Sequence, residues 1–132
     1  MITSILSIIK SLNVIIITGD FEEPGRYIPD WNIIFLDQDL SETEHKIVLL
    51  HELGHAAKHQ GETELYNATI NMKYKMEYEA NYFMIGWLFD DYMKVTDIEP
   101  EDINIFDFMR QNDIPSKDEY MVREIIANYE FD

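Results

Sequence analysis

The sequence contains no cysteine. A chain without thiols forms no disulfide bonds, has no thiol nucleophile and cannot build the cysteine sites of zinc fingers. Histidine and carboxylate side chains are therefore the only strong metal ligands available. Any metal site must be sought among four histidines and 26 acidic residues.

Basic residues are scarce. Ten Lys and Arg stand against 26 Asp and Glu, which gives a formal net charge of -16 at pH 7. Such an acidic surface repels nucleic acid, so the charge argues against direct DNA or RNA binding by this chain. It favours a basic partner or substrate; the competing interpretation is that it only keeps the protein soluble.

The chain also lacks a recognisable export signal and a membrane-spanning segment. The isoleucine-rich residues 1–18 have no basic residue ahead of their apolar part, and Lys10 and Asn13 interrupt them. No small-residue cleavage site follows, and the run is too short and too interrupted to span a bilayer. We therefore expect these residues to be part of the folded structure of a cytoplasmic protein.

The composition is that of a globular protein, with 46% hydrophobic and 13% aromatic residues in a length of 132. No repeat, linker or low-complexity tract divides it, so we predict a single domain over residues 1–132. Apolar residues at helical spacing predict helices over residues 2–12, 41–61, 72–92, 103–109 and from 116 onward. Runs of β-branched residues predict strands at 14–18 and 32–36, with a short one at 26–28 in the loop between them.

These elements predict an α+β fold, in which a small antiparallel or mixed sheet packs on a helical core. Two of the helices have the pattern of a capping box, in which a serine caps the helix and a glutamate three residues later reaches back. The pairs are Ser41 with Glu44, and Ser116 with Glu119.

The helix that begins near Ser41 carries the string His51-Glu52-Leu53-Gly54-His55. Two histidines four residues apart share one helix face, so both imidazoles can reach one metal ion. Glu52 lies close enough to accept a proton from a water activated there. A chance string is the alternative interpretation, but the capped helix start ahead of it is the context that a metal site requires.

A catalytic zinc takes three protein ligands and leaves a fourth position for water. The candidates for the third ligand are His59, Glu77 and Glu79. His59 lies one turn further along the same helix, and the chain would have to bend back for it to reach the ion. We therefore expect His59 to be a supporting or packing residue.

Glu77 and Glu79 point about 200° apart around their helix, so only one of them can face the site. Asn81 shares a face with Glu77 and could hydrogen-bond a ligating histidine, which favours Glu77. Ala80 is small enough to let two helices approach closely. An ordinary solvated acid is the alternative interpretation of Glu77.

Together, HELGH and the later string EYEANYF, which begins at Glu77, resemble the ImmA/IrrE family of zinc metallopeptidases. That family typically shows HELGH followed by E-x-x-A-N/D-x-F-A, and the resemblance covers roughly residues 25–90. It implies a gluzincin-like, zincin-type fold in which His51, His55 and Glu77 bind zinc and Glu52 is the catalytic base.

The resemblance also implies a biological role. Such proteins are often encoded by phages and mobile elements, beside the DNA-binding repressor that they inactivate by cleavage. We therefore predict a zinc-dependent endopeptidase that cleaves a basic helix-turn-helix repressor, with Tyr66, Tyr74 or His59 as candidate donors to the oxyanion. Two alternatives are a metal-stabilised anti-repressor that sequesters the repressor uncut, and a protein whose metal is only structural.

Overall fold

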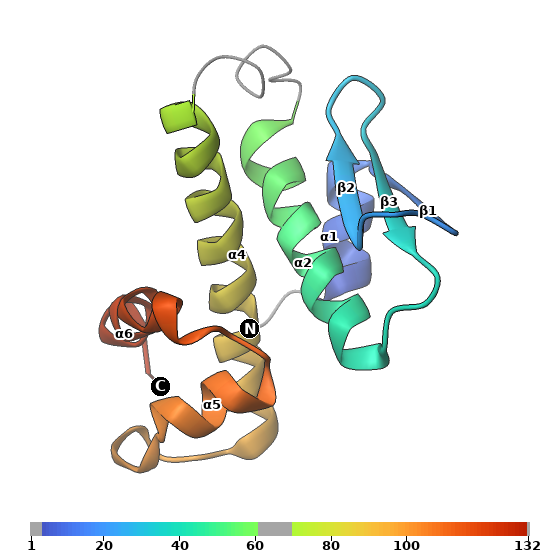
Figure 1. The fold of residues 1–132 in the computed structure, drawn as a ribbon. Coiled ribbons are helices and arrows are strands. Elements are labelled where there is room, and N and C mark those ends of the chain that lie inside the picture. Colours follow the sequence, from blue (N-terminus) through green and yellow to red (C-terminus); the bar gives the residue numbers. More distant parts are fainter. Residues whose placement is uncertain (1–3, 61–69, 132) are drawn as a thin grey trace. The chain divides into compact units, whose positions relative to one another are not determined.

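A computed structural model describes residues 4–60 and 70–131 (Figure 1). It has the predicted α+β architecture, with a small mixed sheet and several helices. The elements in chain order are α1 (Ile5–Leu12), β1 (Ile15–Gly19), β2 (Gly25–Ile28), β3 (Ile33–Asp37), α2 (Glu42–His59), α4 (Ile70–Thr96), α5 (Ile105–Gln111) and α6 (Glu119–Asn128), with 3-10 turns at Pro100–Asp102 and Ser116–Asp118.

The chain divides into two compact units, and the division falls inside α4 between Met84 and Ile85. The first unit contains the sheet, α1, α2 and the first part of α4. The second contains the rest of α4 together with α5 and α6. A single domain over residues 1–132 stays a prediction.

The sheet of the first unit has the strand order β1-β3-β2. β1 runs parallel to β3, with Ile15 opposite Ile33, and β2 runs antiparallel to β3, with Gly25 opposite Leu36. Because side chains alternate along a strand, one face of the sheet can be buried while the other faces outward. The buried face packs with α1 and α2 around a core of Val14, Tyr27, Ile34, Leu36, Leu49, Leu53 and Ala56.

The helix that carries the HELGH string begins as predicted. The Ser41 hydroxyl accepts a hydrogen bond from the Glu44 amide at 3.1 Å, and the Glu44 carboxylate accepts one from the Ser41 amide at 3.0 Å. The predicted helix end near Gly61 and the predicted start of the first helix at residue 2 lie outside the described residues. Within them, α2 extends to His59, so both histidines of the string lie on one continuous helix.

The second predicted capping box is wrong. Ser116 lies inside the 3-10 turn Ser116–Asp118, and no side chain caps either that turn or α6. Pro115 already holds the extended conformation that precedes the turn, with φ -68° and ψ 151°. The chain therefore turns one residue too early for the Ser116 hydroxyl to act as a cap.

Aromatic rings form the centre of the second unit. Phe89 contacts Phe108 and Tyr129 edge to face, with ring centroids 5.4 and 5.0 Å apart, and the Tyr129 hydroxyl donates to Asp90 at 2.6 Å. Phe89 and Phe108 are fully buried, so these rings are part of the core of this unit. Over residues 4–60 and 70–131, the structure has no helix with the length and apolar character needed to cross a membrane.

Candidate metal centre

Helices α2 and α4 bring His51, His55 and Glu77 together. The two oxygens of the Glu77 carboxylate lie 3.0 Å from His51 Nε2 and 2.8 Å from His55 Nε2. Potential ligand atoms of all three residues lie within 4.8 Å of one another. The structure thus joins the two histidines of the HELGH string to Glu77, and Glu79 is not part of the group.

His59 is buried behind this group. Its side chain is only 3% exposed, and its ring centroid lies 5.7 Å from that of His55. This position agrees with the supporting role that we expected for His59.

A glycine–alanine contact sets the spacing of the two helices. A Cβ atom at Gly54 would lie 2.7 Å from the carbonyl oxygen of Ala80 and 2.9 Å from its Cα. Real Cβ atoms essentially never come this close to another atom, so only glycine lets the backbones of α2 and α4 approach in this way. The sequence pointed to Ala80 as the small residue of this contact, but not to its partner Gly54.

Asn81 orients His51. Its side-chain oxygen lies 2.7 Å from His51 Nδ1, which is the hydrogen bond that the sequence predicts for a ligating histidine. Because this oxygen is an acceptor, Nδ1 carries a proton and Nε2 is the ring atom turned toward Glu77. A metal can therefore replace a proton at Nε2 while the bond to Asn81 is kept.

Glu77 and His51 perturb each other's protonation. Hydrogen bonds from His51 and His55 hold the pKa of Glu77 far below its usual value. Burial by itself lowers the pKa of His51, but its hydrogen bond to Glu77 and the charges of Glu52 and Glu77 outweigh burial and raise it. Glu77 is therefore an anion at neutral pH, as a carboxylate ligand must be.

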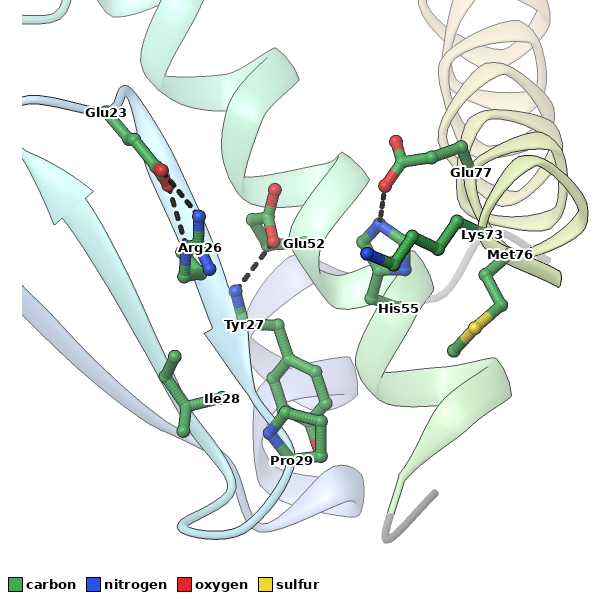
Figure 2. Close-up of a pocket in the computed structure, with 11 residues that line it drawn as sticks. Glu23, Arg26, Tyr27, Ile28, Pro29, Glu52, His55, Lys73, Met76 and Glu77 are labelled. Atoms are coloured by element: carbon green, nitrogen blue, oxygen red, sulfur yellow. Dashed lines mark hydrogen bonds and ion pairs between the residues drawn. The ribbon is translucent and has the colours of Figure 1, made fainter. Parts of the chain in front are cut away.

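Glu52 lies beside the group, held by the edge of the sheet. It is 9% exposed, and its Oε1 accepts a hydrogen bond of 2.7 Å from the backbone amide of Tyr27 in β2 (Figure 2). Burial raises the pKa of Glu52, although the nearby histidines and the Tyr27 amide act in the opposite direction. A carboxylate with a raised pKa is suited to accepting and then releasing a proton near neutral pH.

A cavity of about 530 Å³ opens between β2 and the two helices, a volume typical of ligand sites (Figure 2). Its lining includes Glu52, His55 and Glu77, and also Arg26, Lys73 and Met76, which the sequence did not single out. Lys73 lies one helical turn before Glu77, so helical spacing could have found it. The Tyr27 amide had no such signal, because no sequence pattern marks a backbone donor.

Two of the three predicted oxyanion donors, Tyr74 and His59, do not line this cavity. Tyr74 is 71% exposed, and neither it nor His59 is among the residues that line the cavity. Tyr66 lies outside the described residues. Within the described part of the chain, the cavity-lining side chains that carry a positive charge are Arg26 and Lys73, and Arg26 is bonded to Glu23 at 2.7 Å.

The donor set fits a divalent metal. Two imidazole nitrogens and one carboxylate oxygen are a ligand set found at catalytic zinc sites. Neighbouring ligand atoms around a tetrahedral zinc lie roughly 3.3 Å apart. His51 Nε2 and His55 Nε2 lie 3.0 and 2.8 Å from different oxygens of Glu77, and one potential ligand atom from each of the three residues lies within 4.8 Å of the others. The Glu77 side chain is 56% exposed, so the centre is open to solvent on that side.

Comparison with known families adds one finding. A family model described as IrrE N-terminal-like domain, Peptidase_M78, matches residues 10–94. The match spans the sheet, α2 and the part of α4 that carries Glu77, and it covers most of the chain. Among curated proteins, none matches this sequence.

Proposed function

Because the chain belongs to the IrrE N-terminal-like family of metallopeptidases, we propose that it is a zinc-dependent endopeptidase acting on a protein substrate. The observation that best supports this proposal is the position of the Glu77 carboxylate, within 3.0 Å of both imidazoles and on the same cavity as Glu52. The shared cavity supports a site in which these residues would hold a metal and Glu52 would act as the base on a bound peptide.

His51, His55 and Glu77 would hold the metal, which supplies a Lewis acid for the scissile carbonyl and lowers the pKa of the attacking water. Glu52 takes the proton of that water and passes it to the leaving amine. The Tyr27 amide keeps one oxygen of the Glu52 carboxylate in place during both transfers. Lys73, on the same cavity, provides a positive charge for the oxyanion in place of Tyr74 and His59.

The substrate that we propose is a basic helix-turn-helix repressor of a phage or mobile element. The net charge of -16 supports a basic partner, because opposite charge speeds encounter between two proteins. A DNA-binding target would agree with a cytoplasmic location of the reaction. The same charge repels nucleic acid, so the peptidase would recognise the repressor and not its operator.

The test of the enzymatic proposal is a Glu52→Gln variant. Glutamine cannot act as a base, so we expect cleavage of the repressor to fall by about 10²–10⁴-fold, the usual size of a general-base contribution. Zinc content, measured by mass spectrometry of the purified protein, should not change. Glu79→Gln is the matched control and should cleave normally. Undiminished cleavage by Glu52→Gln would remove Glu52 from the mechanism.

The alternative function is sequestration without cleavage. The acidic charge supports it equally well, because charge complementarity stabilises a complex whether or not a bond is cut. A stable complex with intact repressor in the presence of zinc would favour sequestration. A purely structural metal agrees less well with the exposure of Glu77, because structural zinc sites are closed by four protein ligands.

A further inference from the structure

The outer face of the sheet, turned away from α1 and α2, is largely apolar, and its side chains are half-buried or exposed. Ile34 and Leu36 of β3 are fully buried, so the alternating residues Ile33 and Phe35 point to the outer side. On β1, Ile15 is 58% exposed and Ile17 is 38% exposed. A strand with one face in water normally alternates apolar and polar residues, whereas β1 reads Ile-Ile-Ile-Thr.

The strand register places these side chains in continuous rows. Ile15 lies opposite Ile33, which lies opposite Ile28 on β2. In the next row Ile17 lies opposite Phe35, which lies opposite Arg26 on β2. We use the term outer face for the five apolar residues of these rows. Large exposed apolar patches of this kind mark sites of protein interaction.

A hollow of about 410 Å³ lies at one side of the outer face, beside Phe35 and Ile28. Phe21 forms part of its lining and contacts Phe35 edge to face, with ring centroids 5.2 Å apart. Gly25, Arg26 and Ile28 line this hollow and the cavity of the metal centre alike. A ligand on the outer face can therefore continue around the edge strand β2 to the metal centre.

The two ends of the outer face differ in charge: one end carries a cluster of carboxylates and the other does not carry this cluster. Carboxylate oxygens of Asp20, Asp37 and Asp39 lie within 4.8 Å of one another where β1 and β3 end. Arg26, the cation that lines the hollow, is bonded to Glu23. At the other end, Trp31 in the β2–β3 turn is 67% exposed. The surface is thus apolar over β1 and β3, carries the ion-paired Arg26 on β2, and is negative at one end.

We propose that the outer face docks a basic amphipathic helix of the protein substrate. Its apolar stripe would lie on the isoleucines and Phe35, and its lysines or arginines would meet the carboxylates of Asp20, Asp37 and Asp39. A second copy of the chain fits less well, because two proteins of charge -16 repel each other. The identity of the partner as the substrate rests on the proposed function, whereas docking itself requires no metal.

Binding of a synthetic peptide tests the proposal. The probe is a fluorescent 18-residue amphipathic helix with a leucine stripe flanked by lysines, and the control peptide is a scrambled sequence of identical composition. The Glu52→Gln variant is used so that the probe is not cut. We expect fluorescence anisotropy to show binding of the amphipathic peptide at least tenfold tighter than that of the scrambled one.

Variants of the outer face locate the binding. Ile17→Ser should weaken binding of the amphipathic peptide at least tenfold, and Ile15→Ser, at the more exposed position, gives the same test if Ile17→Ser folds poorly. Asp20→Asn combined with Asp39→Asn should weaken it severalfold and reduce its salt dependence. Val95→Ser is the matched control, because Val95 is 74% exposed on α4 in the second unit and should leave binding unchanged.

Three results would overturn the proposal. One is unchanged affinity in the folded Ile15→Ser and Ile17→Ser variants, and another is equal binding of the scrambled peptide, which would show attraction by charge alone. The third is a dimer of the unliganded protein, detected by light scattering and dissociated by Ile17→Ser. The outer face would then bind a second copy of the chain. If the peptide docks but the unmodified protein does not cleave the repressor, only the proposed enzymatic function is contradicted. If the protein cleaves the repressor but the peptide does not dock, only the proposed docking on the outer face is contradicted.

Discussion

At the residue scale, the candidate centre depends on one carboxylate that faces two imidazoles. Glu77 reaches both His51 and His55 because it projects from α4 toward the face of α2 that carries them. Glu79, two residues later, points about 200° away around the helix. The two glutamates therefore form a matched pair, with the same chemistry and different directions.

Replacing each glutamate in turn tests this assignment. Glu77→Gln removes the anionic ligand, so we expect zinc affinity to fall by more than the roughly 10–100-fold that supporting residues contribute. Glu79→Gln should change it by less than about twofold, because this side chain does not join the group. Competition with a chromophoric chelator measures both affinities. Loss of zinc by Glu79→Gln alone would show that the wrong glutamate has been chosen.

The protonation of His51 predicts how metal binding depends on pH. Its pKa is raised above the ordinary value of 6.5, so a proton competes with the metal at higher pH than at an ordinary histidine. Glu77, whose pKa is lowered, adds no competing proton in this range. We expect zinc affinity to fall about tenfold per pH unit below the pKa of His51, starting above pH 6.5.

Chelator competition at several values between pH 6 and 8 measures this dependence. In the metal-free protein the sign is opposite: the contribution of protonated His51 to stability is complete below pH 6.5 and is lost as the pH rises through its raised pKa. A zinc affinity that stays constant down to pH 6 would contradict the prediction.

At the scale of elements, the contact of α2 with α4 determines whether the ligands meet. Gly54 lies against the backbone of Ala80, which cannot move aside as a side chain could. The same contact lies between His51 and His55 on one helix and beside Glu77 on the other. Any change that separates the helices therefore separates the ligands.

Two glycine-to-alanine variants isolate this contact. Gly54→Ala should destabilise the protein by about 1–3 kcal/mol through overpacking and should weaken zinc binding. Gly86→Ala on α4 is the control, because a Cβ atom there meets nothing within 4 Å. It should stabilise the helix by up to about 1 kcal/mol through propensity alone. Urea denaturation measures the free energy of unfolding of each variant. Equal changes in the two variants would contradict the proposed contact.

At the scale of the whole molecule, a metal at this centre would join α2 to α4. A ligand that binds only the folded state stabilises it by about 2.7 kcal/mol when present at 100 times its dissociation constant. For a chain of this length, that corresponds to a rise in Tm of roughly 10 °C. The stability of the protein should therefore depend visibly on its metal.

Chelation provides the measurement. Treatment of the zinc-loaded protein with EDTA should lower the Tm followed by circular dichroism, and re-added zinc should restore it. Magnesium should not restore it, because imidazole ligands bind magnesium poorly. The Glu77→Gln variant should show a smaller shift. A Tm that is the same with and without zinc would contradict a site that involves both helices.

Much of the site could be predicted from local sequence. The spacing of His51 and His55 determines that they share a helix face, and the Ser41 capping box determines where that helix begins, because both depend only on residues within a few positions of each other. Helical spacing on the second helix predicted that Asn81 bonds one of the two histidines, and the structure shows that this histidine is His51. The capping box at Ser116 failed because Pro115 changed the local backbone, which the four-residue pattern does not include.

Only the tertiary structure decided what these local elements do together. It placed Gly54 against Ala80, the Tyr27 amide against Glu52, and β1 beside β3 with Ile15 and Ile17 outward. Each of these contacts joins segments far apart in the chain, and no local spacing encodes such a pairing. By itself, the sequence thus determined which side chains could bind a metal and in which helices they lie. The folded chain decided which carboxylate reaches both imidazoles, because that depends on how closely two separate backbones can approach.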